Sequence, residues 1–190
     1  MKTKLLMLTI ALSCTFAGSA MAMTKAEYKA EKARISSDYK IAKDKCSSLK
    51  DNAKDICKSE AKGVEKIAKA EAESGYKPSA SNTQKVAMAK ANAMYDTAKE
   101  KCDDLSGNAK DVCIKDAKVA YTKAKDDAKI SKVSKDTSKS KSEKMAEVRK
   151  DAKADENKAK YKAAYERCDA LAGAPKDACQ NDAKVKYGMK

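Results

Sequence analysis

The sequence contains no histidine and no tryptophan, and its single phenylalanine, Phe16, lies within the first 22 residues. The absence of histidine removes the commonest general base, most zinc sites and the attachment of a c-type haem. Leucine is also scarce, because residues 23–190 contain only Leu49, Leu105 and Leu171. A chain with so few large apolar side chains cannot bury a large globular core.

Other familiar reaction centres are missing from the sequence as well. There is no Cys-x-x-Cys pair of the redox or zinc type and no glycine-rich phosphate loop. Acidic residues are plentiful, but none stands in the kind of apolar setting that tunes a catalytic carboxyl. We therefore expect a protein that is not an enzyme and has no cofactor or metal site.

The abundant residues favour helices. Ala, Lys, Asp and Glu dominate the chain, and Ala, Lys and Glu are strong helix formers. No alternating apolar and polar pattern typical of a strand occurs. The composition predicts an all-α protein of long, Ala/Lys-rich helices with narrow apolar seams.

The first 22 residues have the organisation of a secretory signal peptide. Lys2 and Lys4 precede an apolar run over residues 5–17, and the Ala-Met-Ala sequence at 20–22 fits a cleavage site. The alternative, a retained membrane anchor, is disfavoured because the run is shorter than the ~20 residues of a transmembrane helix. We expect cleavage after about Ala22.

Cleavage would leave six of the seven cysteines and a net charge of +12, because it removes Cys14 and two lysines. An even number of cysteines in an exported chain predicts a disulfide framework. The bacterial character of the short signal indicates the periplasm. No later apolar run is long enough to cross a membrane, so we expect no transmembrane segment after cleavage.

A stretch with two cysteines separated by ten residues occurs three times. In each copy a Tyr lies seven residues before the first Cys, a Leu follows that Cys by three, and an Ala-Lys pair follows the second Cys. All of these positions have a structural explanation: each residue belongs to the apolar seam, forms a disulfide or lies on the exposed face of a helix. Nothing that repeats has the character of a reaction centre.

A turn signal lies midway between the two cysteines of each copy. Gly107 and Gly173 suit a positive-φ residue at a helix end, and Asp51 takes this place in the first copy. Asn52 and Asn108 are typical caps for the start of a second helix. One unbroken helix is the alternative, but a proline two residues after Gly173 disfavours it. Each copy therefore predicts a helical hairpin.

In such a hairpin the two cysteines lie at similar distances from the bend, which places them side by side. A disulfide that closes so short a loop contributes about 3 kcal/mol in the chain-entropy model. Six cysteines formally allow 15 pairings. The predicted disulfides are Cys46–Cys57, Cys102–Cys113 and Cys168–Cys179.

The expected organisation has five segments. A signal peptide covers residues 1–22, and the first hairpin covers 23–77. The second hairpin covers 82–130, and a flexible Ser/Lys-rich linker over 131–142 separates it from the third hairpin at 143–190. The sequence leaves open whether the hairpins pack together and whether the protein forms oligomers.

The positive charge is the sequence feature that says most about function. A strongly basic chain associates with polyanions, here lipopolysaccharide, anionic lipid or nucleic acid. Elsewhere the lysines alternate with acids, which is typical of a solvated helical surface. The candidate polyanion contacts cluster around the linker: Lys132, Lys135, Lys139, Lys141 and Lys144.

Two stretches of the sequence resemble known proteins. They are the repeat Cys102-Asp-Asp-Leu-Ser-Gly-Asn-Ala-Lys-Asp-Val-Cys113 and the opening Met23-Thr-Lys-Ala-Glu-Tyr. Both are similar to a group of small exported bacterial proteins with repeated Cys pairs, loosely labelled cell-envelope biogenesis or TolA-like. This resemblance implies a periplasmic setting but no particular activity.

We therefore expect a non-catalytic structural or interaction protein of the bacterial cell envelope, with a role in stress as one form of that function. Its partner is an unknown envelope protein or a polyanion, and no small-molecule substrate is indicated. The alternatives are a cationic polyanion-binding protein and a small periplasmic chaperone whose thin apolar seams open.

Overall fold

The computed structural model describes residues 22–189, so the predicted signal peptide up to Met21, with Cys14, lies outside the described residues. This part of the chain contains no strand, which confirms the all-α prediction. Two short 3₁₀ turns, Cys46–Ser48 and Cys168–Ala170, follow the first and fifth helices. The six helices are α1 (Lys25–Lys45), α2 (Asp51–Tyr76), α3 (Ala80–Cys102), α4 (Gly107–Ser134), α5 (Lys141–Arg167) and α6 (Ala174–Tyr187).

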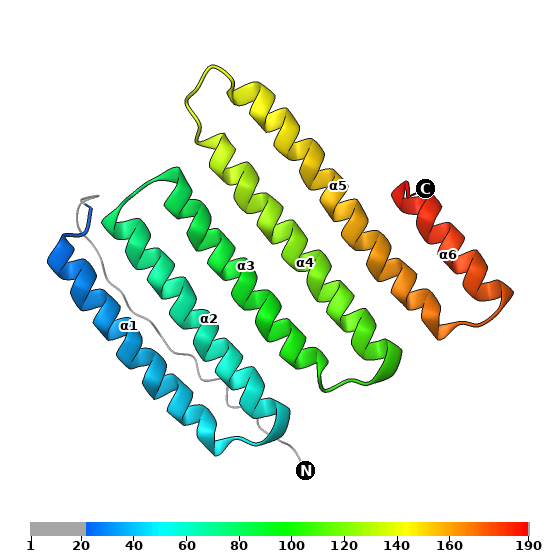
Figure 1. The fold of residues 1–190 in the computed structure, drawn as a ribbon, viewed down its shortest axis with the longest axis horizontal. Coiled ribbons are helices and arrows are strands. Elements are labelled where there is room, and N and C mark those ends of the chain that lie inside the picture. The colour runs from blue at the N-terminus through cyan, green and yellow to red at the C-terminus, as the bar shows by residue number, and fades with distance from the viewer. Residues whose placement is uncertain (1–21, 190) are drawn as a thin grey trace, which may run out of the picture.

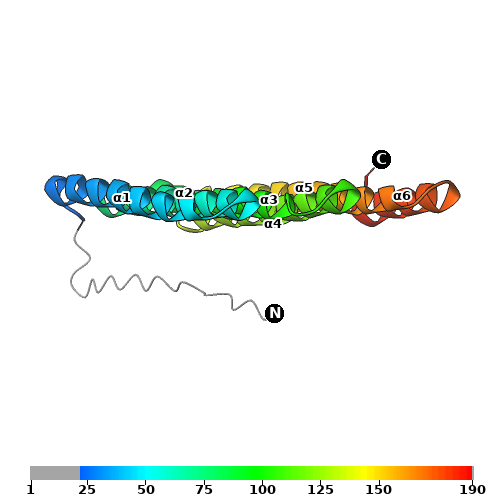
Figure 2. The ribbon, with the colours of Figure 1, turned by 90° about the horizontal axis from the view of Figure 1, so that it is seen from below.

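The helices lie side by side in chain order and form a single flat layer (Figure 1). Viewed edge-on, the layer is one helix thick (Figure 2). Each helix makes its main contacts with the helices before and after it in the sequence. The pairs α1–α2, α3–α4 and α5–α6 are the three predicted hairpins, and their turns lie along one edge of the layer.

The hairpin turns contain the three predicted positive-φ residues. The φ angle is 48° at Asp51, 55° at Gly107 and 60° at Gly173. These residues lie at the start of the second helix of each hairpin, whereas the sequence placed them at the end of the first. Glycine adopts positive φ without a steric penalty, and Asp tolerates it better than most residues.

A disulfide closes each hairpin beside its turn. The Cα–Cα distances are 5.6 Å for Cys46–Cys57, 5.6 Å for Cys102–Cys113 and 5.7 Å for Cys168–Cys179. These are the three pairs that the spacing predicts. The first cysteine of each pair is buried, with at most 1% of its surface exposed. The disulfides therefore take the place of larger apolar side chains near the turns.

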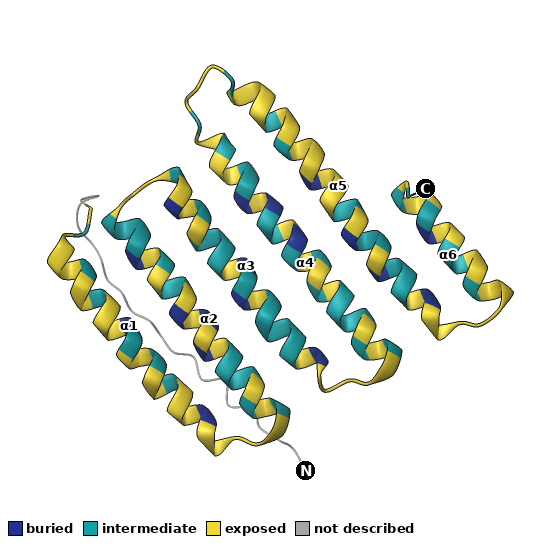
Figure 3. Cartoon of the chain, viewed as in Figure 1, coloured by how far each residue is buried: buried dark blue, intermediate teal, exposed yellow. Residues whose placement is uncertain are grey.

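Small residues fill the boundaries between helices. Most of each helix is intermediate or exposed, and buried positions are few (Figure 3). Ile35 is the only large aliphatic residue that is fully buried within residues 22–189. Gly63 of α2 lies so close to α3 that an added Cβ would be 2.8 Å from the Cβ of Ala93. The buried alanines are Ala61, Ala72, Ala91, Ala93, Ala128, Ala152, Ala159, Ala163 and Ala183.

The hairpins pack against one another, and two asparagines connect them. The Nδ2 of Asn52 donates to the carbonyl oxygen of Glu100 at 2.7 Å, and the Nδ2 of Asn108 donates to that of Glu166 at 2.8 Å. The prediction that these asparagines cap α2 and α4 is therefore wrong. Each helix starts at the residue before the asparagine, two residues earlier than predicted. The amide instead satisfies a carbonyl at the end of the first helix of the next hairpin.

Ion pairs repeat across the same two boundaries. Glu60 lies 3.3 Å from the Nζ of Lys101 between the first and second hairpins. Asp116 accepts hydrogen bonds from Arg167 between the second and third, with 2.7 Å to its Oδ2. In both cases the acid lies three residues after a second Cys, and the base directly precedes a first Cys. The two boundaries therefore share a common set of contacts.

The predicted linker over 131–142 is shorter than expected. Helix α4 continues to Ser134 and α5 begins at Lys141, so only residues 135–140 connect them. Lysine is a good helix former, and α4 packs against α5, with Ala128 buried close to the end of α4. Tertiary packing thus extends the helices into a segment whose composition indicated flexibility.

We predict that Asn108→Ala lowers the free energy of unfolding by about 1–2 kcal/mol, because the Glu166 carbonyl loses its side-chain donor. Urea unfolding followed by circular dichroism measures this change. Asn181→Ala, an exposed site on α6, is the matched control and should change stability by less than about 0.5 kcal/mol. Equal effects of the two substitutions would contradict a connecting role for Asn108.

Candidate interaction surfaces

The edge of the layer that carries the hairpin turns also carries the three leucines of residues 23–190. Leu49, Leu105 and Leu171 are 40%, 45% and 45% exposed. In each turn the leucine N–H donates to the carbonyl of the first Cys, at 2.9 to 3.1 Å. The sequence placed these leucines on the buried seam, but this turn directs them outward. We call this set the leucine edge.

Two of the three recurring tyrosines contact lysines of the same hairpin. The Nζ of Lys62 lies 4.8 Å from the ring centre of Tyr39, and that of Lys118 lies 5.0 Å from the ring of Tyr95. Tyr95 also stacks on Tyr121 with 4.9 Å between ring centres. In the first two copies, a cation–π contact therefore joins the recurring Tyr to the Lys of the Ala-Lys pair.

The predicted polyanion contacts lie at the opposite edge, around the connection from α4 to α5. Lys132 is in the last turn of α4, Lys135 and Lys139 are in the connection, and the other two are in the first turn of α5. All five side chains are exposed. The ammonium of Lys144 is 2.8 Å from the Oδ2 of Asp136, so its charge is partly compensated.

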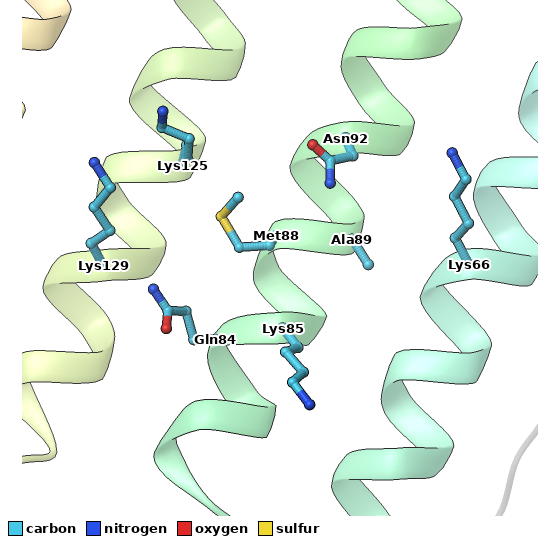
Figure 4. Close-up of a pocket in the computed structure, with 8 residues that line it drawn as sticks. All are labelled: Lys66, Gln84, Lys85, Met88, Ala89, Asn92, Lys125 and Lys129. Atoms are coloured by element: carbon cyan, nitrogen blue, oxygen red, sulfur yellow. The ribbon is translucent and has the colours of Figure 1, made fainter.

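A shallow groove of about 560 Å³ lies over α3, between α2 and α4 (Figure 4). Its floor is α3, with Met88 and Ala89 between two polar side chains, Gln84 and Asn92. Lysines from three helices surround it: Lys66 of α2, Lys85 of α3, and Lys125 and Lys129 of α4. No sequence motif indicated this groove, because it exists only once the second hairpin packs against the first.

Carboxylates already pair with most of the lysines around this groove. Lys66 is 3.3 Å from Asp96, and Lys85 is 2.8 Å from Glu73. Lys129 is 2.8 Å from Asp126 and 3.7 Å from Asp155. The groove therefore presents less net positive charge than its four lysines imply, and the lysine cluster at 132–144 is the stronger candidate for an anion.

Two acidic side chains are buried, which the sequence did not indicate. Glu65 accepts hydrogen bonds from Lys62 at 2.7 Å and Lys69 at 2.6 Å. Burial raises the pKa of Glu65, but the two lysines outweigh it and the pKa is lowered. Asp126 is 0% exposed and accepts from Lys129 at 2.8 Å. Lysines hold both carboxylates, and such pairing is typical of a structural role.

Between residues 22 and 189, no three or more metal-ligating side chains of the His, Cys, Asp or Glu type are grouped to hold an ion. No helix of the same region has an apolar stretch long enough to cross a membrane. No family model matches the sequence, and no curated protein or solved structure matches it significantly.

Titration of Asp136 can test the contacts in the connection between α4 and α5. Hydrogen bonds from the Lys144 ammonium and from Ser138 lower the pKa of Asp136 to about 2. Because this pKa is lower than the ordinary value of 3.8, the contact stabilises the connection above about pH 4. This contribution is lost as the pH falls toward 2.

We predict that the Asp136 carboxyl carbon titrates in NMR spectra with a midpoint near 2. Lys144→Gln should move this midpoint upward, because the ammonium is the largest cause of the lowered pKa. Lys141→Gln changes the net charge equally and should leave the midpoint nearly unchanged. A midpoint close to 3.8 in the unmodified protein would show that the contact does not form in solution.

Proposed function

We propose that this protein is a non-catalytic structural or interaction protein of the bacterial cell envelope, exported to the periplasm and TolA-like in its setting. The observation that carries the proposal is the arrangement of three disulfide-closed hairpins in a layer one helix thick. Such a layer exposes two broad faces and two edges to partners, and the groove over α3 is open to solvent.

Three disulfides support an oxidising compartment, because such bonds are rare in proteins of the reducing cytosol. The predicted cleavage site is compatible with the fold. Cleavage after Ala22 would make Met23 the first residue, and its backbone nitrogen lies 2.9 Å from the carbonyl oxygen of Gly75. Gly75 lies in the last turn of α2, where the helix dipole favours a positive charge such as a new amino group.

The leucine edge is the surface that we assign to the envelope partner. Exposed leucines at equivalent turns form a periodic apolar row, and large exposed apolar side chains are often contact sites. The turns also contain acids, including Asp103, Asp104 and Asp169, so the row has a polar surround. A partner would bind it through apolar contacts bordered by charge.

A photo-crosslinking amino acid in place of Leu105 tests this assignment in living cells. We expect it to capture a defined envelope protein, because Leu105 is central in the row. The same probe in place of Met94 is the matched control, since Met94 is 65% exposed on a broad face. Capture at both sites with equal yield, or at neither in a correctly exported chain that begins at Met23, would contradict the proposal.

A second candidate function is the binding of anionic lipid, and the exposed lysine cluster at 132–144 favours it. Each lysine near an anionic surface contributes about 1 kcal/mol, and this attraction is screened by salt. Only Lys144 of the five pairs with a carboxylate within the described residues. The flat layer would bring this edge to a membrane without steric hindrance from a second layer.

We predict that replacing the five lysines with glutamine weakens binding to anionic vesicles at low salt by at least tenfold. The matched control replaces five exposed lysines of α1, which changes the net charge equally: Lys25, Lys29, Lys32, Lys40 and Lys43. Vesicle co-sedimentation at two salt concentrations measures both. Equal losses in the two variants would mean that overall charge, rather than this cluster, causes binding.

A further inference from the structure

The two boundaries between hairpins are built from equivalent residues. On one side, an Asn five residues before the second Cys and an acid three residues after it face the next hairpin. On the other side are a carbonyl two residues before the first Cys and a base directly before that Cys. The chain thus makes the same type of interface with itself twice.

The two outermost helices carry the halves of this interface that remain unmatched. On α6 the acid position is Asp182, and on α1 the base position is Lys45. Both side chains are exposed, and neither forms an ion pair within the described part of the chain. Asp44 is the residue of α1 whose backbone carbonyl is equivalent to those of Glu100 and Glu166.

An apolar position is also unmatched on α6. Val185 lies six residues after the second Cys of its copy and is 83% exposed. The equivalent residue in the first copy is Gly63, which packs against Ala93 of the next hairpin. Ala93 lies nine residues before the first Cys of its copy. The equivalent residue of α1 is Ser37, which is small and exposed. A second copy packed against α6 would cover this exposed valine, with the small Ser37 opposite it.

We propose that the outer side of α6 binds the outer side of α1 of a second copy of this chain. Charge complementarity supports this occupant, because Asp182 would meet Lys45 as Glu60 meets Lys101 and Asp116 meets Arg167. The contact is head-to-tail, so it extends the layer in its own plane and leaves an open row. It does not depend on the proposed envelope role, since the purified mature chain contains both surfaces.

This contact is weaker than the internal ones for two reasons. Ala174 occupies the position of Asn52 and Asn108, so the amide donor is missing. Helix α6 has 14 residues, whereas α2 has 26 and α4 has 28, so it covers less of the neighbouring helix. We therefore expect self-association only at high concentrations of the protein.

Sedimentation velocity of the oxidised mature protein over a wide concentration range tests the proposal. Ala174→Asn restores the missing donor and should tighten self-association roughly fivefold, the value of one net hydrogen bond. Asp182→Lys should weaken association several-fold, and the double variant Asp182→Lys with Lys45→Asp should recover it. Asp151→Lys is the matched control, because it makes the same charge change at an exposed position of α5. It should leave self-association unchanged.

Circular dichroism and the absence of free thiols verify that each variant is folded. Monomers at every concentration, for both the unmodified chain and Ala174→Asn, would overturn the proposal. Association of the Ala174→Asn variant that is equally tight with and without Lys45→Asp would also overturn it, because a surface that lacks Lys45 would then be responsible. Failure of the double charge swap to restore association would exclude the head-to-tail arrangement in favour of α6 with α6 or α1 with α1.

Discussion

A covalent bond beside each turn holds this protein together. Helices with alanine seams bury little apolar area, and within residues 22–189 no second layer covers either face of the layer. Closing a loop of about a dozen residues stabilises a hairpin by about 3 kcal/mol in the chain-entropy model. The bond between Cys46 and Cys57 and its two equivalents thus supplies what large side chains supply elsewhere. Because the bonds bring the paired helices together near the turn, small residues along the rest of the seam are sufficient.

The close approach of helices allows polar side chains to connect the hairpins. With Gly63 against Ala93, the backbones of α2 and α3 are near enough for a short amide side chain to reach the neighbouring carbonyl. Asn52 and Asn108 do this at equivalent positions, and a charged pair lies beside each. The layer therefore resembles other repeat architectures, in which stability is a sum of unit and nearest-neighbour terms.

The features that the sequence predicted correctly are local ones. The repeat, the disulfide pairs and the positive-φ residues depend on residues within about a dozen positions, and spacing alone determines whether they can meet. The function of Asn52 and Asn108 depends on a carbonyl 48 or 58 residues away, so a local reading assigned them to helix caps. A signal for their role was present, because the third copy, whose second helix packs against no further hairpin among the described residues, carries Ala174 in their place.

The remaining differences have the same origin. Residues 131–134 are rich in Ser and Lys, yet they extend α4 because α5 packs beside it. Leu105 follows the apolar spacing of α3, but the turn after Cys102 directs it to solvent. The lysines that surround Met88 come from three helices and two hairpins, so no linear motif represents them. Each case requires knowledge of which helices are neighbours.

The order of the helices has a consequence for how the chain folds. Every helix makes its main contacts with the helix that precedes or follows it, so no segment waits for a distant one. Chains with such local contacts fold quickly, because little loop entropy is lost before contacts form. The first hairpin can therefore close and oxidise before the third has formed. Folding can then proceed from one hairpin to the next, because each new pair of helices packs against a hairpin that is already formed.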